Sequence, residues 1–420
     1  MSILSRCAIG MGTLLAVSAG AAATPGFQFN LLLQQGDALP DLGANLTSIR
    51  HVSLNNNGEF IFGGLSDASA DRDFIYRGNI NTLDLDLLAR RGGMIPGADP
   101  ALTHGLFRAA VGINNAGDTT FATRHLPGNL DTIHLNGARF LGNPDTVDGD
   151  QIGLIFHSQV DGMGNPWAVI GLGANTATNR ALIRGSDVIL RKGSMVDGIN
   201  IVDISTSEAS AGSKLRVNDA GDYIVEINGN TGAANHRSLI FNGSEIQRQG
   251  ASFLGGVVDF IDHTGVTENG NAWYTVTLDG FSGPRFLVYD GNVLGGTGDD
   301  LGNGLTLDRM QIATANSNGD WMASASILGA DADSDRALIF NGKIVAQKGD
   351  AAFPGFLWND FGFLRDLQLN DAGEFIFSGS LIPEGGGSAV NVLVSGVIPT
   401  PGAVSLFALA GLAAVRRRRN

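Results

Sequence analysis

The chain has 420 residues, with 27 Lys and Arg against 41 Asp and Glu, and its formal net charge is −14. A hydrophobic content of 43% is enough for a packed core and excludes a disordered chain. The 60 glycines have no three-residue period and only 12 prolines accompany them, which excludes collagen, and the acidic charge disfavours binding to nucleic acid.

Residues 1–23 have the pattern of a secretory signal. Arg6 supplies a positive charge, an apolar stretch runs from Ala8 to Ala19, and three alanines at 21–23 form a site that a signal peptidase can cleave. The only cysteine, Cys7, lies in this segment. We therefore expect an exported chain whose mature form has no disulfide bond and no cysteine-ligated metal.

Two glycine motifs recur seven times in residues 24–396. The first has the form Asn-x-x-Gly, and its glycines are Gly58, Gly117, Gly164, Gly221, Gly270, Gly319 and Gly373. The second, of which RALIFNG is an example, ends at Gly78, Gly137, Gly185, Gly243, Gly291, Gly342 and Gly396. In every copy the second glycine follows the first by 20 to 23 residues, which indicates one repeated supersecondary unit.

Each unit of about 50 residues is predicted to contain four antiparallel strands. Segments such as LRDLQL and FIFSGSL flank the Asn-x-x-Gly turn, the RALIFNG segment makes a third strand, and KIVAQKG makes a fourth. Seven such units predict an all-β protein, a seven-bladed β-propeller of four-stranded blades. A row of separate sandwiches or a β-solenoid is an alternative, although four strands alone bury one face poorly.

The two ends of the repeat array predict how the ring closes. The last unit stops at Gly396 without a fourth strand, whereas Phe27–Asp37 precedes the first unit as an unpaired strand. Its ending, QQGD, matches the QKGD that ends at Asp350. We expect the N-terminal strand to complete the last blade, with Phe29–Gln34 paired to Val390–Ser395.

Motifs of known catalytic sites are missing from the sequence. The body has no H-E-x-x-H, G-x-S-x-G or P-loop motif. Seven histidines are scattered over different units without the spacing of metal ligands, and we interpret them as packed or solvated side chains: His51, His104, His125, His134, His157, His236 and His263. The sequence therefore predicts no catalytic residue.

One loop alternates carboxylates in the manner of a calcium site. Asp331, Asp333 and Asp335 resemble the opening of a calcium-binding loop, but Arg336 and Gly342 stand where an EF-hand requires Gly and Glu. A simpler calcium turn and a solvated hairpin loop are the two interpretations. Calcium is the only cofactor that the sequence suggests, and residues 67–73 repeat the pattern in the first unit.

A second loop, from Ala351 to Phe363, gathers aromatic residues that the other units lack. Phe356 and Trp358, with Asp360 beside them, are the candidate ligand-binding residues, because aromatic rings on a loop stack on sugars or on a partner. The alternative is a hydrophobic plug. Both candidate loops join strands at the ends opposite the Asn-x-x-Gly turns, so we expect a ligand on that face.

Residues 397–420 read as a sorting tail. Pro399 and Pro401 precede an uncharged run from Ala403 to Val415, which is followed by four arginines at 416–419. The run is short for a permanent membrane anchor. The order of these parts resembles the PEP-CTERM tail of bacterial surface proteins, although Thr400 stands where that family has Glu. The resemblance implies transient anchoring in the inner membrane and cleavage by an exosortase-type enzyme.

Removal of both ends leaves 22 basic and 41 acidic residues, a net charge of −19. The sequence therefore predicts an exported protein of the extracellular space, cell surface or outer membrane that acts as a binding or scaffold module. A surface polysaccharide, a matrix component or a protein are the ligands considered. An extracellular polysaccharide hydrolase or lyase and a purely structural surface protein are the alternatives.

Overall fold

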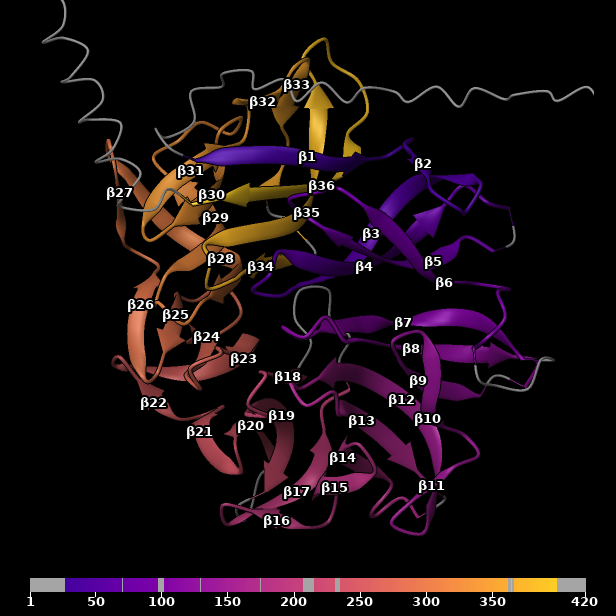
Figure 1. Ribbon diagram of the computed structural model, residues 1–420. Coiled ribbons are helices and arrows are strands. Elements are labelled where there is room, and N and C mark those ends of the chain that lie inside the picture. Colours follow the sequence, from indigo (N-terminus) through magenta and orange to yellow (C-terminus); the bar gives the residue numbers. More distant parts are fainter. Residues whose placement is uncertain are drawn as a thin grey trace, which may run out of the picture.

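The computed structural model describes residues 27–69, 71–96, 102–128, 130–173, 175–206, 215–230, 235–361, 364 and 366–398. Seven antiparallel sheets follow one another around a common axis (Figure 1). This arrangement confirms the predicted all-β, seven-bladed propeller. The predicted leader, residues 1–23, and the tail from residue 399 onward lie outside the described residues. In the described part of the chain, no helix is long and apolar enough to cross a membrane.

The first four blades use residues 38–248. Blade 1 contains β2 (Ala38–Leu39), β3 (Ala44–Leu54), β4 (Glu59–Ser66), β5 (Asp73–Asn79) and β6 (Leu85–Arg90). Blade 2 contains β7 (Thr103–Ile113), β8 (Thr119–Leu126), β9 (Asp131–Leu135) and β10 (Ala138–Gly142). Blade 3 contains β11 (Thr146–Val147), β12 (Asp150–Val160), β13 (Pro166–Leu172), β14 (Arg180–Arg184) and β15 (Asp187–Arg191). Blade 4 contains β16 (Met195–Val196), β17 (Ile199–Ile204), β18 (Leu215–Val217), β19 (Tyr223–Asn230), β20 (Asn235–Phe241) and β21 (Ser244–Arg248).

The last three blades use residues 252–397 and the N-terminal strand. Blade 5 contains β22 (Ser252–Phe253), β23 (Gly256–Val266), β24 (Ala272–Leu278), β25 (Arg285–Tyr289) and β26 (Asn292–Gly296). Blade 6 contains β27 (Asp300–Gly302), β28 (Leu305–Ala315), β29 (Trp321–Leu328), β30 (Arg336–Phe340) and β31 (Lys343–Gln347). Blade 7 contains β1 (Gln28–Gln34), β32 (Ala351–Phe353), β33 (Phe356–Trp358), β34 (Leu367–Leu369), β35 (Glu374–Pro383) and β36 (Val390–Val397).

The predicted number of strands per blade needs a correction. Only blade 2 has four strands in its sheet, and the other described sheets have five or six. The added strand is a segment of two or three residues that turns back onto the start of the long first strand, as β11 does onto β12. A turn at Asp148 and Gly149, both with positive φ, makes this possible. So short a segment has no alternating pattern to reveal it.

The ring closes as predicted. β1 pairs antiparallel with β36, and the register runs from Gln28 opposite Val397 to Gln34 opposite Val392. The QQGD and QKGD segments also make the same turn, since the N–H of Gly36 donates to the carbonyl of Leu46 and that of Gly349 donates to the carbonyl of Trp358. One blade is therefore built from both ends of the chain (Figure 1).

The hydrophobic core is divided among the interfaces between blades. Seven clusters of buried side chains each combine residues of two neighbouring blades. Leu33 and Leu393 of blade 7, for example, pack with Phe62 of blade 1. Each blade thus buries one face against the blade before it and the other against the blade after it.

Candidate functional site

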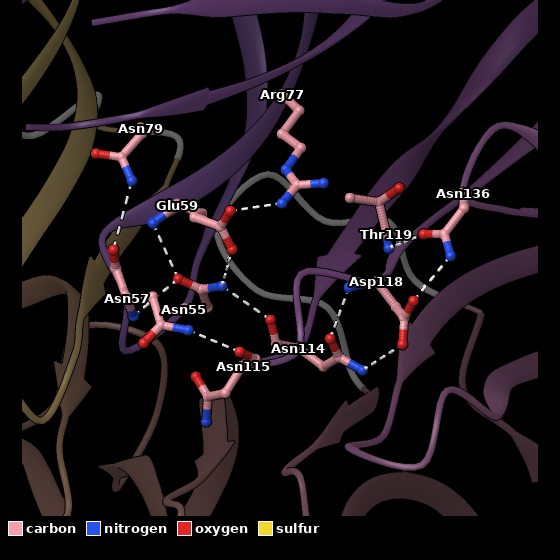
Figure 2. Close-up of polar contacts among 10 residues, drawn as sticks. All are labelled: Asn55, Asn57, Glu59, Arg77, Asn79, Asn114, Asn115, Asp118, Thr119 and Asn136. Carbon is pink, nitrogen blue, oxygen red and sulfur yellow. Dashed lines mark hydrogen bonds and ion pairs between the residues drawn. The ribbon is translucent and has the colours of Figure 1, made fainter. Parts of the chain in front are cut away.

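The first Asn-x-x-Gly turn shows how the motif works. In blade 1 the side-chain oxygen of Asn55 accepts the N–H groups of Asn57 and Glu59 at 3.0 and 2.9 Å (Figure 2). Gly58 takes a φ of 72°, a conformation that glycine adopts without strain. The motif therefore satisfies its own turn with the amide oxygen and leaves the amide N–H₂ group for other partners.

The amide nitrogen links each turn to the next blade. Five motif asparagines donate from Nδ2 to the backbone carbonyl of the first motif residue in the following blade, over 2.7 to 3.0 Å. The donor–acceptor pairs are Asn55–Asn114, Asn114–Asp161, Asn218–Thr267, Asn316–Asn370 and Asn370–Asn55. The first motif residues therefore form a ring of hydrogen bonds around the axis, and we call it the turn ring.

Two blades have another residue at the first motif position. In blade 3 the carboxylate of Asp161 accepts the indole N–H of Trp167 and forms an ion pair with Arg184. The ring continues there through the N–H of Gly162, which donates to the carbonyl of Asp219 at 3.0 Å. In blade 5, which has Thr267, Asn269 donates its amide to the carbonyl of Ser317 at 2.9 Å. The seven turns are thus joined without a break.

The second motif residues lie inside the turn ring. Asn56 accepts the N–H of Asp371 at 2.8 Å, and the N–H of Asn115 in turn reaches the carboxylate of Asp219 at 3.3 Å. That bond passes over blade 3, where a side chain on Gly162 would collide with Asp219. The N–H of Asp219 donates to Glu268 at 3.1 Å. Polar side chains from six blades consequently meet at one end of the axis.

A cavity of about 110 Å³ lies on the axis at this end. All seven blades contribute to its lining, mainly through the last residues of their first strands and, in five blades, through turn residues. The lining includes Asn115, Gln159, Arg216, Trp273, Glu268 and Gln368. The volume is that of about three or four water molecules. The lining is mostly polar, with amide, carboxylate, guanidinium and indole groups, and it can hydrogen-bond a small polar group from several directions.

Charge within this axial cavity is uneven. Burial raises the pKa of Glu268 to about 7, and the negative charges of Asp219 and Asp371 add to the shift while the N–H of Asp219 opposes it. Arg216 lies deeper, on β18. Burial lowers the pKa of its guanidinium, which the charge of Asp366 partly offsets. The rim therefore carries a carboxyl group that takes up a proton more readily than an ordinary glutamate.

The aromatic loop is largely part of the core. Trp358 is 4% exposed and its ring contacts those of Phe29, Phe353, Phe361 and Phe377. The ring fills the place that Leu307 has in blade 6, since Trp358 lies opposite Leu381 as Leu307 lies opposite Ile327. The buried position of the Trp358 ring fits the hydrophobic plug, the alternative interpretation of this loop.

The two residues beside Trp358 are less deeply placed. Phe356 is half-buried against the same cluster of side chains. Asp360 lies 3.7 Å from the guanidinium of Arg336. Neither side chain lies near the axial cavity.

The three aspartates of the proposed calcium turn lie on an exposed loop between β29 and β30. Asp335 pairs with Lys348 at 3.3 Å, and the carbonyl of Asp331 accepts the N–H of Ser334 at 2.9 Å. Among the described residues, no group of three His, Cys, Asp or Glu side chains is arranged to hold a metal ion. Asp331, Asp333 and Asp335 therefore remain a predicted site that would need to close around an ion.

A second hollow lies on the face where the sequence predicts a ligand. It has a volume of about 290 Å³ and is lined by blade 1 alone, with Ser69, Asp71, Arg90 and Arg91 as its polar groups. Arg91 faces the buried carboxylate of Asp73 at 3.7 Å. This hollow lacks the convergence of several blades that the axial cavity has.

Sequence reasoning missed the axial residues. It used the first and fourth motif positions, which are regular, and ignored the second position, which reads Asn56, Asn115, Gly162, Asp219, Glu268, Ser317 and Asp371. Variation in polar type at one fixed position of a repeat is the signal that could have indicated a lined cavity.

One family model and several solved structures are similar to this chain. A family of unknown function, DUF7453, matches residues 16–135. No curated protein matches the chain. Among solved structures, a gluconolactonase from Xanthomonas campestris is similar at 11% identity and a TM-score of 0.32, covering 90% of this chain and 98% of its own.

Two further solved structures are similar. The β-propeller domain of the Trilobed protease from Pyrococcus furiosus has 10% identity and a TM-score of 0.39, covering 82% of this chain and 97% of its own. A puromycin hydrolase has 12% identity and a TM-score of 0.39, over 81% of this chain and 50% of its own. The fold of this chain is established by its seven sheets.

Proposed function

We propose that this protein is an exported, surface-sorted β-propeller that binds a hydroxyl-rich ligand, such as the end of a surface polysaccharide, in the axial cavity. The leader, the tail and the acidic body support export and sorting. The axial cavity supports binding, because amide and carboxylate groups converge there from six blades on a frame held by the turn ring. Sugar hydroxyls both donate and accept hydrogen bonds, which matches this mixture of groups.

The ligand enters at the face of the Asn-x-x-Gly turns. Gln159, Gln368 and Asn115 offer neutral amides, and Trp273 offers an apolar surface at the same cavity. Because the volume is only about 110 Å³, it accepts the hydroxyl groups at one end of a chain and leaves the rest in solvent.

Binding to a glycan panel, with and without calcium, tests this proposal. Gln368→Ala should weaken binding at least tenfold, since the amide it removes faces the ligand. Asp333→Asn, on the exposed loop of the opposite face, is the matched control and should leave binding unchanged. Binding that needs calcium and is lost in Asp333→Asn, but not in Gln368→Ala, would move the site to the calcium turn.

One observation favours a second candidate function. Glu268 has a raised pKa beside two further carboxylates, an arrangement that general acid catalysis uses in glycoside hydrolysis. Release of reducing ends from a bound glycan, lost in Glu268→Gln with binding retained, would identify a hydrolase. Binding without turnover would identify a binding module. Neither outcome tests the predicted calcium turn or the sorting tail.

A further inference from the structure

Three histidines meet in the core of blade 2. His104 on β7, His125 on β8 and His134 on β9 are 1%, 1% and 0% exposed. The ring centroids of His104 and His134 are 4.8 Å apart, and those of His125 and His134 are 5.9 Å apart. His134 also stacks on Phe121 at 4.8 Å. We call these three residues the histidine cluster.

The cluster is poorly satisfied by hydrogen bonds. Nδ1 of His104, Nε2 of His125 and Nε2 of His134 are buried without a partner. The other ring nitrogens of His125 and His134 have long contacts, 3.5 Å to the hydroxyl of Thr132 and 3.4 Å to the carbonyl of Gly137. Buried polar atoms without partners destabilise a fold, so these residues are not explained by stability.

Blades 5 and 6 have aliphatic side chains at the same places. His104 lies opposite His125 as Leu307 lies opposite Ile327 in blade 6, and His134 lies opposite Phe121 as Ile339 lies opposite Ala323. In blade 5 the corresponding residues are Val258, Leu278 and Val288. All six aliphatic side chains are buried. Blade 2 therefore has three ionisable rings at core positions that blades 5 and 6 fill with Ile, Leu or Val.

The surroundings oppose a positive charge on the cluster. Burial lowers the pKa of His104 to about 4, and burial also lowers the pKa of His125 and, further, that of His134, with the neighbouring histidines and Arg139 adding repulsion. Asp131 attracts His125, but its carboxylate already pairs with Arg108 at 2.7 Å and Arg124 at 3.1 Å.

Among the described residues of the adjoining blades, no carboxylate attracts the histidine cluster; the one such attraction, from Asp131, comes from blade 2 itself. Blade 1 faces this side of blade 2 with apolar residues, Ile61, Ile75 and Ala89. The strand of blade 3 that packs on blade 2, β12, carries another buried histidine, His157. The surroundings of the histidine cluster consequently favour its neutral form while the blade is closed.

We propose that blade 2 is an acid-operated element: protonation of the histidine cluster opens this blade while the other six stay folded. An open blade hydrates the rings and returns each pKa to its ordinary value near 6.5. The open state therefore binds more protons than the closed state between that value and the lowered one, and acid favours opening. For His104 alone, a pKa of about 4 in the closed blade changes the opening equilibrium about 30-fold between pH 7.5 and pH 5.

Opening has a consequence at the axis. Blade 2 supplies Asn114, which accepts from Asn55 and donates to the carbonyl of Asp161 in the turn ring. Among the described residues, a single bridge between Met94 and Thr103 stands in blade 2 where other blades have a short fifth strand. The blade contributes only a few aliphatic side chains to its two interfaces.

Hydrogen–deuterium exchange of the mature protein at pH 7.5 and pH 5, corrected for intrinsic exchange rates, tests the proposal without any ligand. Peptides from residues 103–142 should show at least a 30-fold gain in opening at pH 5, and peptides from blade 6 should show little. A variant with the residues of blade 6, His104→Leu with His125→Ile and His134→Ile, should lose this gain. His236→Gln, at a half-buried histidine of blade 4, should retain it.

Three results would overturn the proposal. One is equal acid sensitivity in all blades, which would indicate global acid unfolding. Another is an unchanged gain in the triple variant. If that variant does not fold, the single variant His134→Ile replaces it and should reduce the gain. The third is a rise in melting temperature with Zn²⁺ at pH 7.5 that the triple variant loses, which would make the histidine cluster a metal site.

Discussion

The side-chain amide of Asn370 in blade 7 donates a hydrogen bond of 2.9 Å to the backbone carbonyl of Asn55 in blade 1, across 315 positions of sequence. The same two blades are joined by a hydrophobic cluster that contains Leu33 of β1. The ring is therefore closed twice, by polar bonds at the axis and by apolar packing farther out. Five of the seven blades make this asparagine-to-carbonyl bond. The contribution of one such bond to stability can therefore be measured by changing a single asparagine.

Asn316→Asp should lower the free energy of unfolding by about 1–3 kcal/mol. The carboxylate still accepts the N–H groups of Asn318 and Asp320, but it cannot donate to the carbonyl of Asn370. That carbonyl keeps the N–H of Gly373 and faces a carboxylate oxygen in place of its amide donor. Urea unfolding measures the change. Asn292→Asp, at an exposed turn where the amide contacts only Asp290, is the control and should change stability by less than about 0.5 kcal/mol. Equal effects of the two variants would show that the turn ring does not stabilise the fold.

A chain that begins at residue 38 should melt at a sharply lower temperature than one that begins at residue 24. The shorter chain lacks β1, which leaves β36 as an unpaired edge and removes Phe29 from its contacts with Trp358 and Phe375. Calorimetry should show one cooperative transition in each chain. Equal melting temperatures would show that closure by β1 does not stabilise the ring.

The fold could be predicted from the sequence because the relevant signals are local and repeated. The nearly constant offset between the two glycine series reflects the length of two strands and one turn. In blade 1, Gly58 lies in the turn, and Gly78 lies near the end of β5, just before the next turn. The unpaired strand before the first unit and the missing strand in the last unit then predicted closure. The short strands such as β11 were missed because two residues carry no periodic pattern.

The sites were less predictable because they depend on which blades become neighbours. Glu268 meets Asp219 and Asp371 from blades 4 and 7, and no spacing in the sequence records that meeting. One unit contains His104, His125 and His134. Their contact depends on the register of the strands, which shifts at irregularities in the pairing of β7 with β8. Alignment of the seven units would have placed these histidines at positions that are aliphatic in blades 5 and 6.

Trp358→Ala should destabilise the fold by about 3–5 kcal/mol, because it removes a buried ring and leaves a cavity among Phe29, Phe353 and Phe361. Guanidinium unfolding measures the loss. Phe281→Ala, at a ring that is 68% exposed, is the matched control and should cost far less. A stable Trp358→Ala protein that fails to bind glycans would instead restore the predicted role of Trp358 as a stacking platform.

The mature protein in its native cell should lack the arginines at 416–419. The Pro-x-Pro segment, the short apolar run and the arginine cluster together predict cleavage after transient anchoring. Intact-mass measurement of the exported protein checks this. Replacement of Arg416–Arg419 by glutamine should leave the unprocessed chain in the inner membrane. Detection of a peptide that contains these arginines on exported protein would contradict processing.

Glu268→Gln should make stability less dependent on pH between pH 4.5 and pH 7.5. In the folded protein burial and the charges of Asp219 and Asp371 raise the pKa of Glu268 to about 7, against an ordinary value of 4.5. The folded state therefore binds more protons in this window, and the favourable contribution of the protonated carboxyl, complete below pH 4.5, is lost as the pH rises through 7.

This contribution of Glu268 to the free energy of unfolding is about 1 kcal/mol, because solvent reaches much of its side chain. The stability difference between Glu268→Gln and the natural protein, measured by urea unfolding at several pH values, isolates this carboxyl from the histidine cluster, which acts in the opposite direction. The difference should grow in favour of the variant as the pH rises. Asp333→Asn, on the exposed loop, should give a difference that is flat with pH. A flat difference for Glu268→Gln as well would mean that its carboxyl titrates at its ordinary value and that the axial carboxylates are too well solvated to act on one another.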